Sequence, residues 1–156
     1  MLRWLWLSAF VVLLDQATKV AAETWLTSFQ PVPVLPSLNL TLVYNTGAAF
    51  SFLAGAGGWQ RWFFVGIALV VGVGIVVWLG RLKPGERVVA AGLSLVLGGA
   101  VGNVIDRIAY GHVIDFIDAY YGSWHWPAFN AADSAISVGA ALLIIDSLFG
   151  RRRDQE

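Results

Sequence analysis

The chain has 156 residues, of which 58% are apolar and only 13% are charged. A water-soluble domain carries about 25% charged residues, so the composition indicates a membrane protein, and the length leaves no room for a separate soluble domain. Ten Lys and Arg residues balance ten Asp and Glu residues, so no net charge attracts nucleic acid. Because Cys is absent, disulfides and thiolate metal sites are excluded.

The first apolar segment, residues 4–25, is interrupted by Asp15 and Lys19. We predict a retained membrane-spanning helix, because a cleavable signal peptide has small neutral residues where these two charges stand. Asp15 and Lys19 are four positions apart and share one helical face, where they can form an ion pair. That pair either neutralises itself near the outer end of the helix or helps to order a site, and the spacing leaves both readings open.

Residues 30–51 form a long segment before the next span. Three prolines are followed by the alternating sequence LNLTLVY at residues 38–44, which predicts a short strand or hairpin arm. An isolated strand would expose unpaired backbone groups, so we expect it to lie at the membrane surface against the helices. A turn of small and polar residues follows at 45–51.

The next two spans are predicted at residues 62–80 and about 88–106. Both are uncharged until the second reaches Asp106, and both are long enough to cross a bilayer. Gly98 and Gly102 lie four residues apart in the second of them. Small residues at this spacing favour close packing between membrane helices.

Aromatic side chains are dense in residues 108–132, which precede the last span. Tyr110, Tyr120, Tyr121, Trp124 and Trp126 fall there, which is typical of a membrane interface. The fourth span is predicted at about residues 133–150 and contains one acid, Asp146. Because no repeat or linker interrupts the pattern, residues 1–156 are expected to form one integral-membrane domain.

Positive charge predicts the topology. Seven Lys and Arg residues fall at the N-terminus, in the loop at 81–87 and in the tail at 151–153, whereas Arg61 and Arg107 mark the opposite ends of their spans. Since cytoplasmic loops are rich in Lys and Arg, we expect both termini in the cytoplasm and both long segments outside. The predicted fold is an all-α membrane protein with four transmembrane helices and a small β element.

Polar side chains gather near the predicted outer face. Asn103, Asp106 and Arg107 end the third span, Asp115 follows eight residues after Arg107, and Asp133 begins the last span. If both flanking helices end at the outer surface, the carboxylates of Asp115 and Asp133 lie at similar depth and can converge. Asp133 also suits the N-cap of the last helix, but capping does not account for Asp115 in its apolar surroundings.

Two carboxylates in a partly dry cleft have a definite chemical use. They cannot both ionise easily, so one pKa rises, the other falls, and the pair shares a proton. One carboxylate can then take a proton from water while the other polarises a carbonyl group, which is the aspartic mechanism of peptide hydrolysis.

The ordered motifs resemble those of lipoprotein signal peptidase, also called signal peptidase II. They are DQATK at 15–19, NTGAAF at 45–50, GNVIDR at 102–107, VIDF at 113–116 and FNAAD at 129–133. The resemblance covers residues 15–150 and implies a four-helix bundle with an extracytoplasmic β-cradle and a short amphipathic helix over the site. Carried over by position, it makes Asp115 and Asp133 the catalytic pair. The supporting residues would be Asp15, Lys19, Asn45, Gly47, Asn103, Asp106, Arg107 and Asn130.

From the residues themselves, Asn103 and Asn130 can bind substrate backbone or orient the carboxylates. Arg107 can neutralise Asp106 or contact a polar lipid or peptide group, and we expect Asp106 with Arg107 to give structural support.

The resemblance also implies a substrate and a location. The substrate would be a bacterial prolipoprotein whose cysteine already carries diacylglycerol, cleaved just before that cysteine. The enzyme would be a multi-pass protein of the bacterial inner membrane with its site near the outer face, inhibited by globomycin and using no metal or cofactor. We expect it to work as a monomer in contact with membrane lipid, without nucleic acid.

Three other functions deserve comparison. His112 and His125 suggest a metallopeptidase, but the HExxH pattern is missing. Lys19 with Ser51 or Ser134 would make a Ser–Lys hydrolase, although nothing in the sequence brings either pair together. A small transporter or scaffold with a carboxylate path predicts polar residues along the whole length of the spans, whereas the sequence concentrates them at one face.

Overall fold

The computed structural model describes residues 1–47 and 57–149, and within them lie the four predicted membrane helices. A short 3₁₀ turn, Leu2–Trp4, leads into α1 (Leu5–Trp25). The others are α2 (Trp59–Arg81), α3 (Arg87–Tyr110) and α4 (Ala131–Phe149). Each helix has the length and apolar character needed to cross a bilayer, so the prediction of four spans is confirmed.

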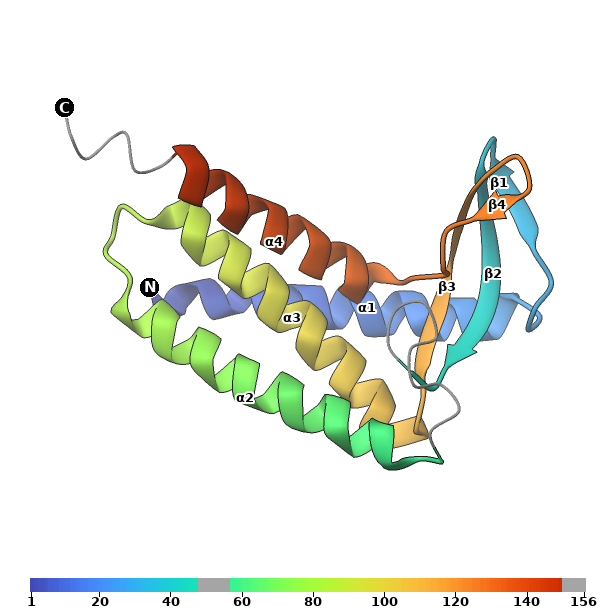
Figure 1. Ribbon diagram of the computed structural model, residues 1–156, viewed down its shortest axis with the longest axis horizontal. Helices are drawn as coiled ribbons and strands as arrows, with labels where there is room; N and C mark the ends of the chain where they lie inside the picture. The colour runs from blue at the N-terminus through green and yellow to red at the C-terminus, as the bar shows by residue number, and fades with distance from the viewer. Residues whose placement is uncertain (48–56, 150–156) are drawn as a thin grey trace.

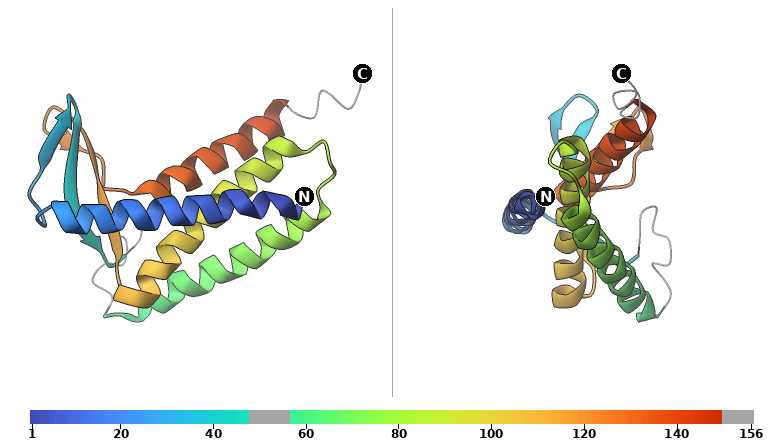
Figure 2. Two further views of the ribbon diagram at one scale, coloured as in Figure 1. Left: turned by 180° about the vertical axis from the view of Figure 1, so that it is seen from behind. Right: turned by 90° about the vertical axis from the view of Figure 1, so that its left-hand side faces the viewer.

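The helix α3 occupies the centre of the bundle, and α1, α2 and α4 all pack against it (Figures 1 and 2). The β-strands gather at one end of the bundle, while the N-terminus and the end of α4 lie at the other. The cytoplasmic position of both termini stays a prediction from charge, and residues 150–156, which include the three tail arginines, lie outside the described part.

Glycines of α3 let its neighbours approach closely. A Cβ atom on Gly98 would lie 2.7 Å from Cβ of Val11 in α1, and one on Gly99 would collide with the carbonyl oxygen of Ala132 in α4. Such close approach lets helices pack where lipid provides no hydrophobic drive for association. The packing sets the part of α1 between Ser8 and Asp15 and the first turn of α4 against the same stretch of α3.

The β element is a four-stranded antiparallel sheet in the order β1-β2-β3-β4. Its strands are β1 (Val32–Leu35), β2 (Leu38–Asn45), β3 (Val113–Tyr121) and β4 (Trp124–His125). The strand predicted at 38–44 is therefore confirmed as part of β2. The sequence analysis missed β3 because its first four residues are all buried, which removes the alternation of polar and apolar residues that marks a half-exposed strand.

The sheet is fixed to the bundle at two places. Apolar side chains of Leu42, Ile114 and Phe116 pack against Ala22 near the end of α1. At the other place Gly111 ends α3 with φ of 82°, a conformation that glycine adopts without strain, and its N–H donates to the carbonyl of Arg107. The chain thus turns directly from α3 into β3 and places Asp115 beside the end of α3.

The resemblance also implied a short amphipathic helix over the site. The described residues contain no such helix, and residues 48–56, which hold the rest of the NTGAAF motif and Ser51, lie outside them.

Candidate active site

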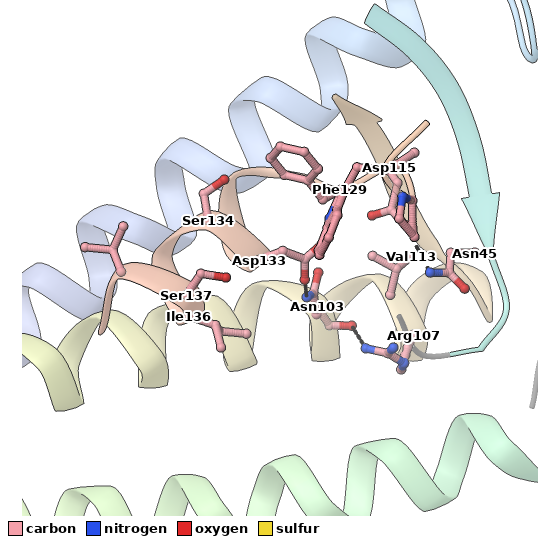
Figure 3. Close-up of a pocket in the computed structure, with 14 residues that line it drawn as sticks. Asn45, Asn103, Arg107, Val113, Asp115, Phe129, Asp133, Ser134, Ile136 and Ser137 are labelled. Carbon is pink, nitrogen blue, oxygen red and sulfur yellow. Dashed lines mark hydrogen bonds between the residues drawn. The ribbon is translucent and has the colours of Figure 1, made fainter. Parts of the chain in front are cut away.

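A cavity of about 530 Å³ opens where the sheet meets α3 and α4 (Figure 3). Its polar lining includes Asn45, Asn103, Arg107, Asp115, Asp133 and Ser134, and residues 126–129 form another part of its wall. The structure therefore brings both predicted catalytic acids into one pocket.

Asp115 projects from β3 and is 2% exposed. Its Oδ1 accepts a hydrogen bond from Nδ2 of Asn130 at 2.8 Å, and its Oδ2 accepts one from Nδ2 of Asn45 at 3.1 Å. Burial, followed by the nearby charge of Asp133, raises the pKa of Asp115 to about 7, although the two amides and the charge of Lys19 oppose the shift. This carboxyl group can therefore hold a proton near neutral pH.

Asp133 lies in the first turn of α4 and is not the N-cap considered in the sequence analysis. The helix begins at Ala131, and Asn130 occupies the capping position. Oδ1 of Asn130 accepts the N–H of Asp133 at 2.9 Å, while Oδ2 of Asp133 accepts the N–H of Asn130 at 3.3 Å. This reciprocal arrangement is a capping box. It leaves Oδ1 of Asp133 to accept Nδ2 of Asn103 at 2.8 Å.

Asn130 connects the two acids. Its side-chain oxygen binds the backbone of Asp133 while its Nδ2 binds the carboxylate of Asp115, and the same nitrogen lies 3.2 Å from Oδ1 of Asn103. Asn130 is completely buried, so its amide cannot exchange these partners for water. One fixed residue thus contacts both acids, the Asp115 carboxylate through its side-chain nitrogen and the Asp133 carboxylate through its backbone N–H.

A buried lysine lies behind this amide network. Nζ of Lys19 is 2.7 Å from carboxylate oxygens of both Asp15 and Asp106, and it donates to Oδ1 of Asn103 at 3.1 Å. The three charged residues are at most 1% exposed. Asp15 and Lys19 therefore do more than neutralise each other, because Asn103, which accepts the hydrogen bond from Lys19, lines the pocket.

The two acids of this triad also hold backbone. Asp15 accepts the N–H of Ala132 at 2.9 Å at the start of α4, and Asp106 accepts the N–H of Ile114 at 3.1 Å in β3. A Cβ atom on Gly102 would lie 2.5 Å from the Asp15 carboxylate, so glycine is needed for that acid to approach α3. The triad fixes the backbone next to each predicted catalytic acid.

Arg107 does not neutralise Asp106, contrary to one expectation from the sequence. Successive helix residues point about 100° apart, so Asp106 faces α1 while Arg107 faces the pocket. Arg107 donates to the carbonyls of Asn103 at 3.3 Å and Gly47 at 3.0 Å, and its guanidinium lies 5.2 Å from the ring centre of Phe64. Gly47, another predicted site residue, is thereby held at the edge of the pocket.

Gln16 is a site-supporting residue that the sequence analysis missed. Its Nε2 donates to Oδ1 of Asp106 at 2.9 Å and lies 3.3 Å from both the carbonyl of Gly102 and a carboxylate oxygen of Asp15. Its position inside the DQATK motif was the feature of the sequence that could have identified it.

The described residues considered for other functions lie outside the pocket or have other partners. His125 contacts Asp118 and His112 packs against Tyr44, and neither histidine lines the pocket within the described part of the chain. No group of three or more potential metal ligands occurs among the described residues. Lys19 is committed to two carboxylates, and the hydroxyl of Ser134 donates to the carbonyl of Asn130.

Comparisons with known proteins agree with this arrangement. The family model described as "Signal peptidase (SPase) II" matches residues 7–149. The chain is 54% identical to "Lipoprotein signal peptidase" of Hydrogenovibrio crunogenus, over 97% of this chain and 88% of that protein. It is also 54% identical to the protein of the same name from Pseudomonas aeruginosa, over 93% and 87%.

A solved structure described as a bacterial membrane enzyme, determined at 2.3 Å resolution, superposes with a TM-score of 0.85. The two sequences are 32% identical, and the alignment covers 99% of this chain and 92% of the other.

The buried triad leads to a prediction about stability. Lys19→Met leaves two buried carboxylates without their cation, and we expect a loss of about 3–5 kcal/mol in unfolding free energy. Unfolding of the purified protein in detergent measures the loss. Lys83→Met removes an exposed lysine and serves as the control. Equal stability of the two variants would show that the triad does not hold the site together.

Proposed function

The chain belongs to the signal peptidase II family, a family of peptidases that remove signal peptides from prolipoproteins, and we propose that it does so as an aspartic endopeptidase with Asp115 and Asp133 as its catalytic pair. The observation that carries this proposal is the binding of both acids by the single buried side chain of Asn130 in one pocket. An aspartic mechanism requires two carboxyl groups that converge on one water molecule.

In the proposed reaction, the pair starts with one proton. The ionised carboxylate takes a proton from a water molecule, whose oxygen attacks the scissile carbonyl carbon. The protonated carboxyl group donates its proton to the carbonyl oxygen, which gives a neutral tetrahedral intermediate. As the intermediate collapses, the carboxyl group that took the proton from water gives it to the departing amine and the C–N bond breaks. One hydroxyl of the intermediate re-forms the C=O bond and returns its proton to the other carboxylate, which restores the starting pair. We assign the initial proton to Asp115 because its pKa is raised to about 7.

The amides hold the pair without neutralising it. Asn103, Asn130 and Asn45 donate hydrogen bonds to the two carboxylates, which fixes their orientation. Arg107 lines the pocket, where its guanidinium can bind the polar peptide groups of a substrate, and Gly47 helps to hold that guanidinium through its carbonyl. Asp15, Lys19 and Asp106 act through these groups and give structural support.

The substrate we propose is a prolipoprotein whose cysteine bears diacylglycerol, cut just before that cysteine. A lipid-modified cysteine is held at the membrane interface, so binding the peptide bond becomes a matter of positioning. Residues of β2 and β3 line the pocket, so it lies at the sheet end of the bundle, which we place at the outer face of the bacterial inner membrane. We further propose that the protein acts as a monomer without metal or cofactor and that globomycin inhibits it.

Replacing either acid should abolish the reaction. Asp115→Asn and Asp133→Asn keep the shape of each side chain but remove a group that must carry or accept a proton, and we expect processing to fall by about 10²-fold or more. Cleavage of a lipidated precursor by purified enzyme measures this. Asp146→Asn alters an acid of α4 outside the pocket and should retain activity. Retained turnover in either dyad variant would refute the assignment.

Lipid on the cysteine should govern cleavage. The purified enzyme is expected to process a diacylglyceryl-modified precursor and to leave its unlipidated twin largely uncut, since only the first is held at the depth of the pocket. Parallel time courses in the same membrane mimetic provide the comparison. Equal rates for the two substrates would contradict the proposed substrate class while leaving the dyad untouched.

Activity should also depend on pH in a defined direction. Below about pH 7 Asp115 is protonated, and above it this carboxyl group loses the proton that the mechanism requires. We therefore expect kcat/KM to fall as the pH rises through the range above 7, measured at lipidated substrate concentrations well below KM, because kcat/KM reports ionisations of the free enzyme. A kcat/KM that keeps rising to strongly alkaline pH would show that no protonated carboxyl group takes part.

A further inference from the structure

A second cluster of polar side chains lies in the sheet around Asp118, which is buried on β3. Its Oδ1 is 2.7 Å from Nδ1 of His125 on β4. Its Oδ2 accepts hydrogen bonds from Nδ2 of Asn39 at 3.1 Å and from the hydroxyl of Thr41 at 3.3 Å. Burial works to raise the pKa of Asp118, but the hydrogen bonds, led by that from His125, outweigh it and keep the pKa below its usual value.

The residues that follow His125 line the pocket that contains Asp115 and Asp133. Residues 126–129, which we call the pocket wall, follow His125 and line the cavity. The wall is attached to β3 at both ends, because the N–H of Trp126 donates to the carbonyl of Ala119 at 2.8 Å and that of Phe129 to the carbonyl of Ile117 at 3.1 Å. Because Trp126 follows His125 directly, movement of β4 away from β3 would pull on the Trp126 end of the wall.

The strand β4 has little else to hold it. It contains two residues, and its ladder consists of the pairs Tyr120–His125 and Tyr121–Trp124. A ladder this short is marginal in water. The imidazole of His125 stacks on the ring of Tyr120, with centroids 5.2 Å apart, so its contact with Asp118 is the charged anchor of the hairpin.

We propose that His125 is a positioning residue, whose ion pair with Asp118 clamps the pocket wall and thereby sets the affinity of the enzyme for its substrate. The kinetic part rests on the proposed function, since the wall borders the pocket that holds the catalytic pair. The clamp itself is a property of the sheet.

Solvent reaches one side of the clamp. The His125 side chain is 51% exposed, while that of Asp118 is 11% exposed and shielded. Asp118 is the charged group that faces the imidazole, with Tyr120 stacked on it and Asn39 and Thr41 bound to the far oxygen of Asp118. The carboxylate is thereby held in place for the exposed imidazole.

Two readouts test the clamp in variants of the full-length enzyme. The first is hydrogen exchange at the amides of Trp126 and Phe129, which requires no activity. The second is the split between KM and kcat for a lipidated precursor. His125→Gln removes the charge, His125→Lys keeps a cation, and His112→Gln is the matched control, since that histidine packs against Tyr44 and Tyr110 outside the pocket.

We expect His125→Gln to speed exchange at both amides and to raise KM by about two- to fivefold, the factor that a partly exposed ion pair supports, with kcat unchanged. The exchange rates and KM of His125→Lys should lie closer to those of the unmodified enzyme, and those of His112→Gln should equal them. Adding Asp118→Asn to His125→Gln should change the exchange rates and KM little further, because both substitutions break the same contact.

Unchanged exchange at the wall in His125→Gln would overturn the proposal, as would a His125→Lys variant no better than His125→Gln. A fall in kcat with constant KM would also overturn it. Failure of the aspartic assignment is recognised separately, since active Asp115→Asn or Asp133→Asn enzyme bears on the dyad and leaves the exchange result intact.

Discussion

A lysine buried between two carboxylates joins the parts of the molecule that form the site. Removing Lys19, Asp15 and Asp106 from water is costly, and their contacts of 2.7 Å offset that cost only while all three remain together. The two acids come from α1 and α3, and each also accepts a backbone N–H, one at the start of α4 and one in β3. The triad therefore ties together the elements that carry the catalytic pair.

The distance of this lysine from the pair matters for the chemistry. Asn45, Asn103 and Asn130 donate to the carboxylates of Asp115 and Asp133 through neutral amides, and Lys19 donates to Asn103 rather than to either acid. A cation in direct contact would favour ionisation of both acids. Neutral donors orient the carboxylates and leave their mutual repulsion in place, which is what the proposed sharing of one proton requires.

Hydropathy and alternation predicted the four spans and the strand around Leu38–Asn45, because lipid-facing helices and half-exposed strands have regular patterns. The order of the motifs led to the prediction that Asp115 and Asp133 act as a pair. Other features depend on side-chain direction and tertiary contacts that a linear pattern does not contain. The partner of Asp106 is Lys19 and not adjacent Arg107, and the contact of Gln16 with Asp106 spans 90 positions.

The central claim is that two carboxyl groups in this pocket share one proton. Infrared spectroscopy of the purified protein with isotopically labelled aspartate reports protonated carboxyl groups directly. We predict a protonated Asp115 signal that disappears as the pH rises through about 7 and whose titration moves to lower pH in Asp133→Asn, where the neighbouring charge is gone. A titration of Asp115 that Asp133→Asn leaves unchanged would contradict the claim.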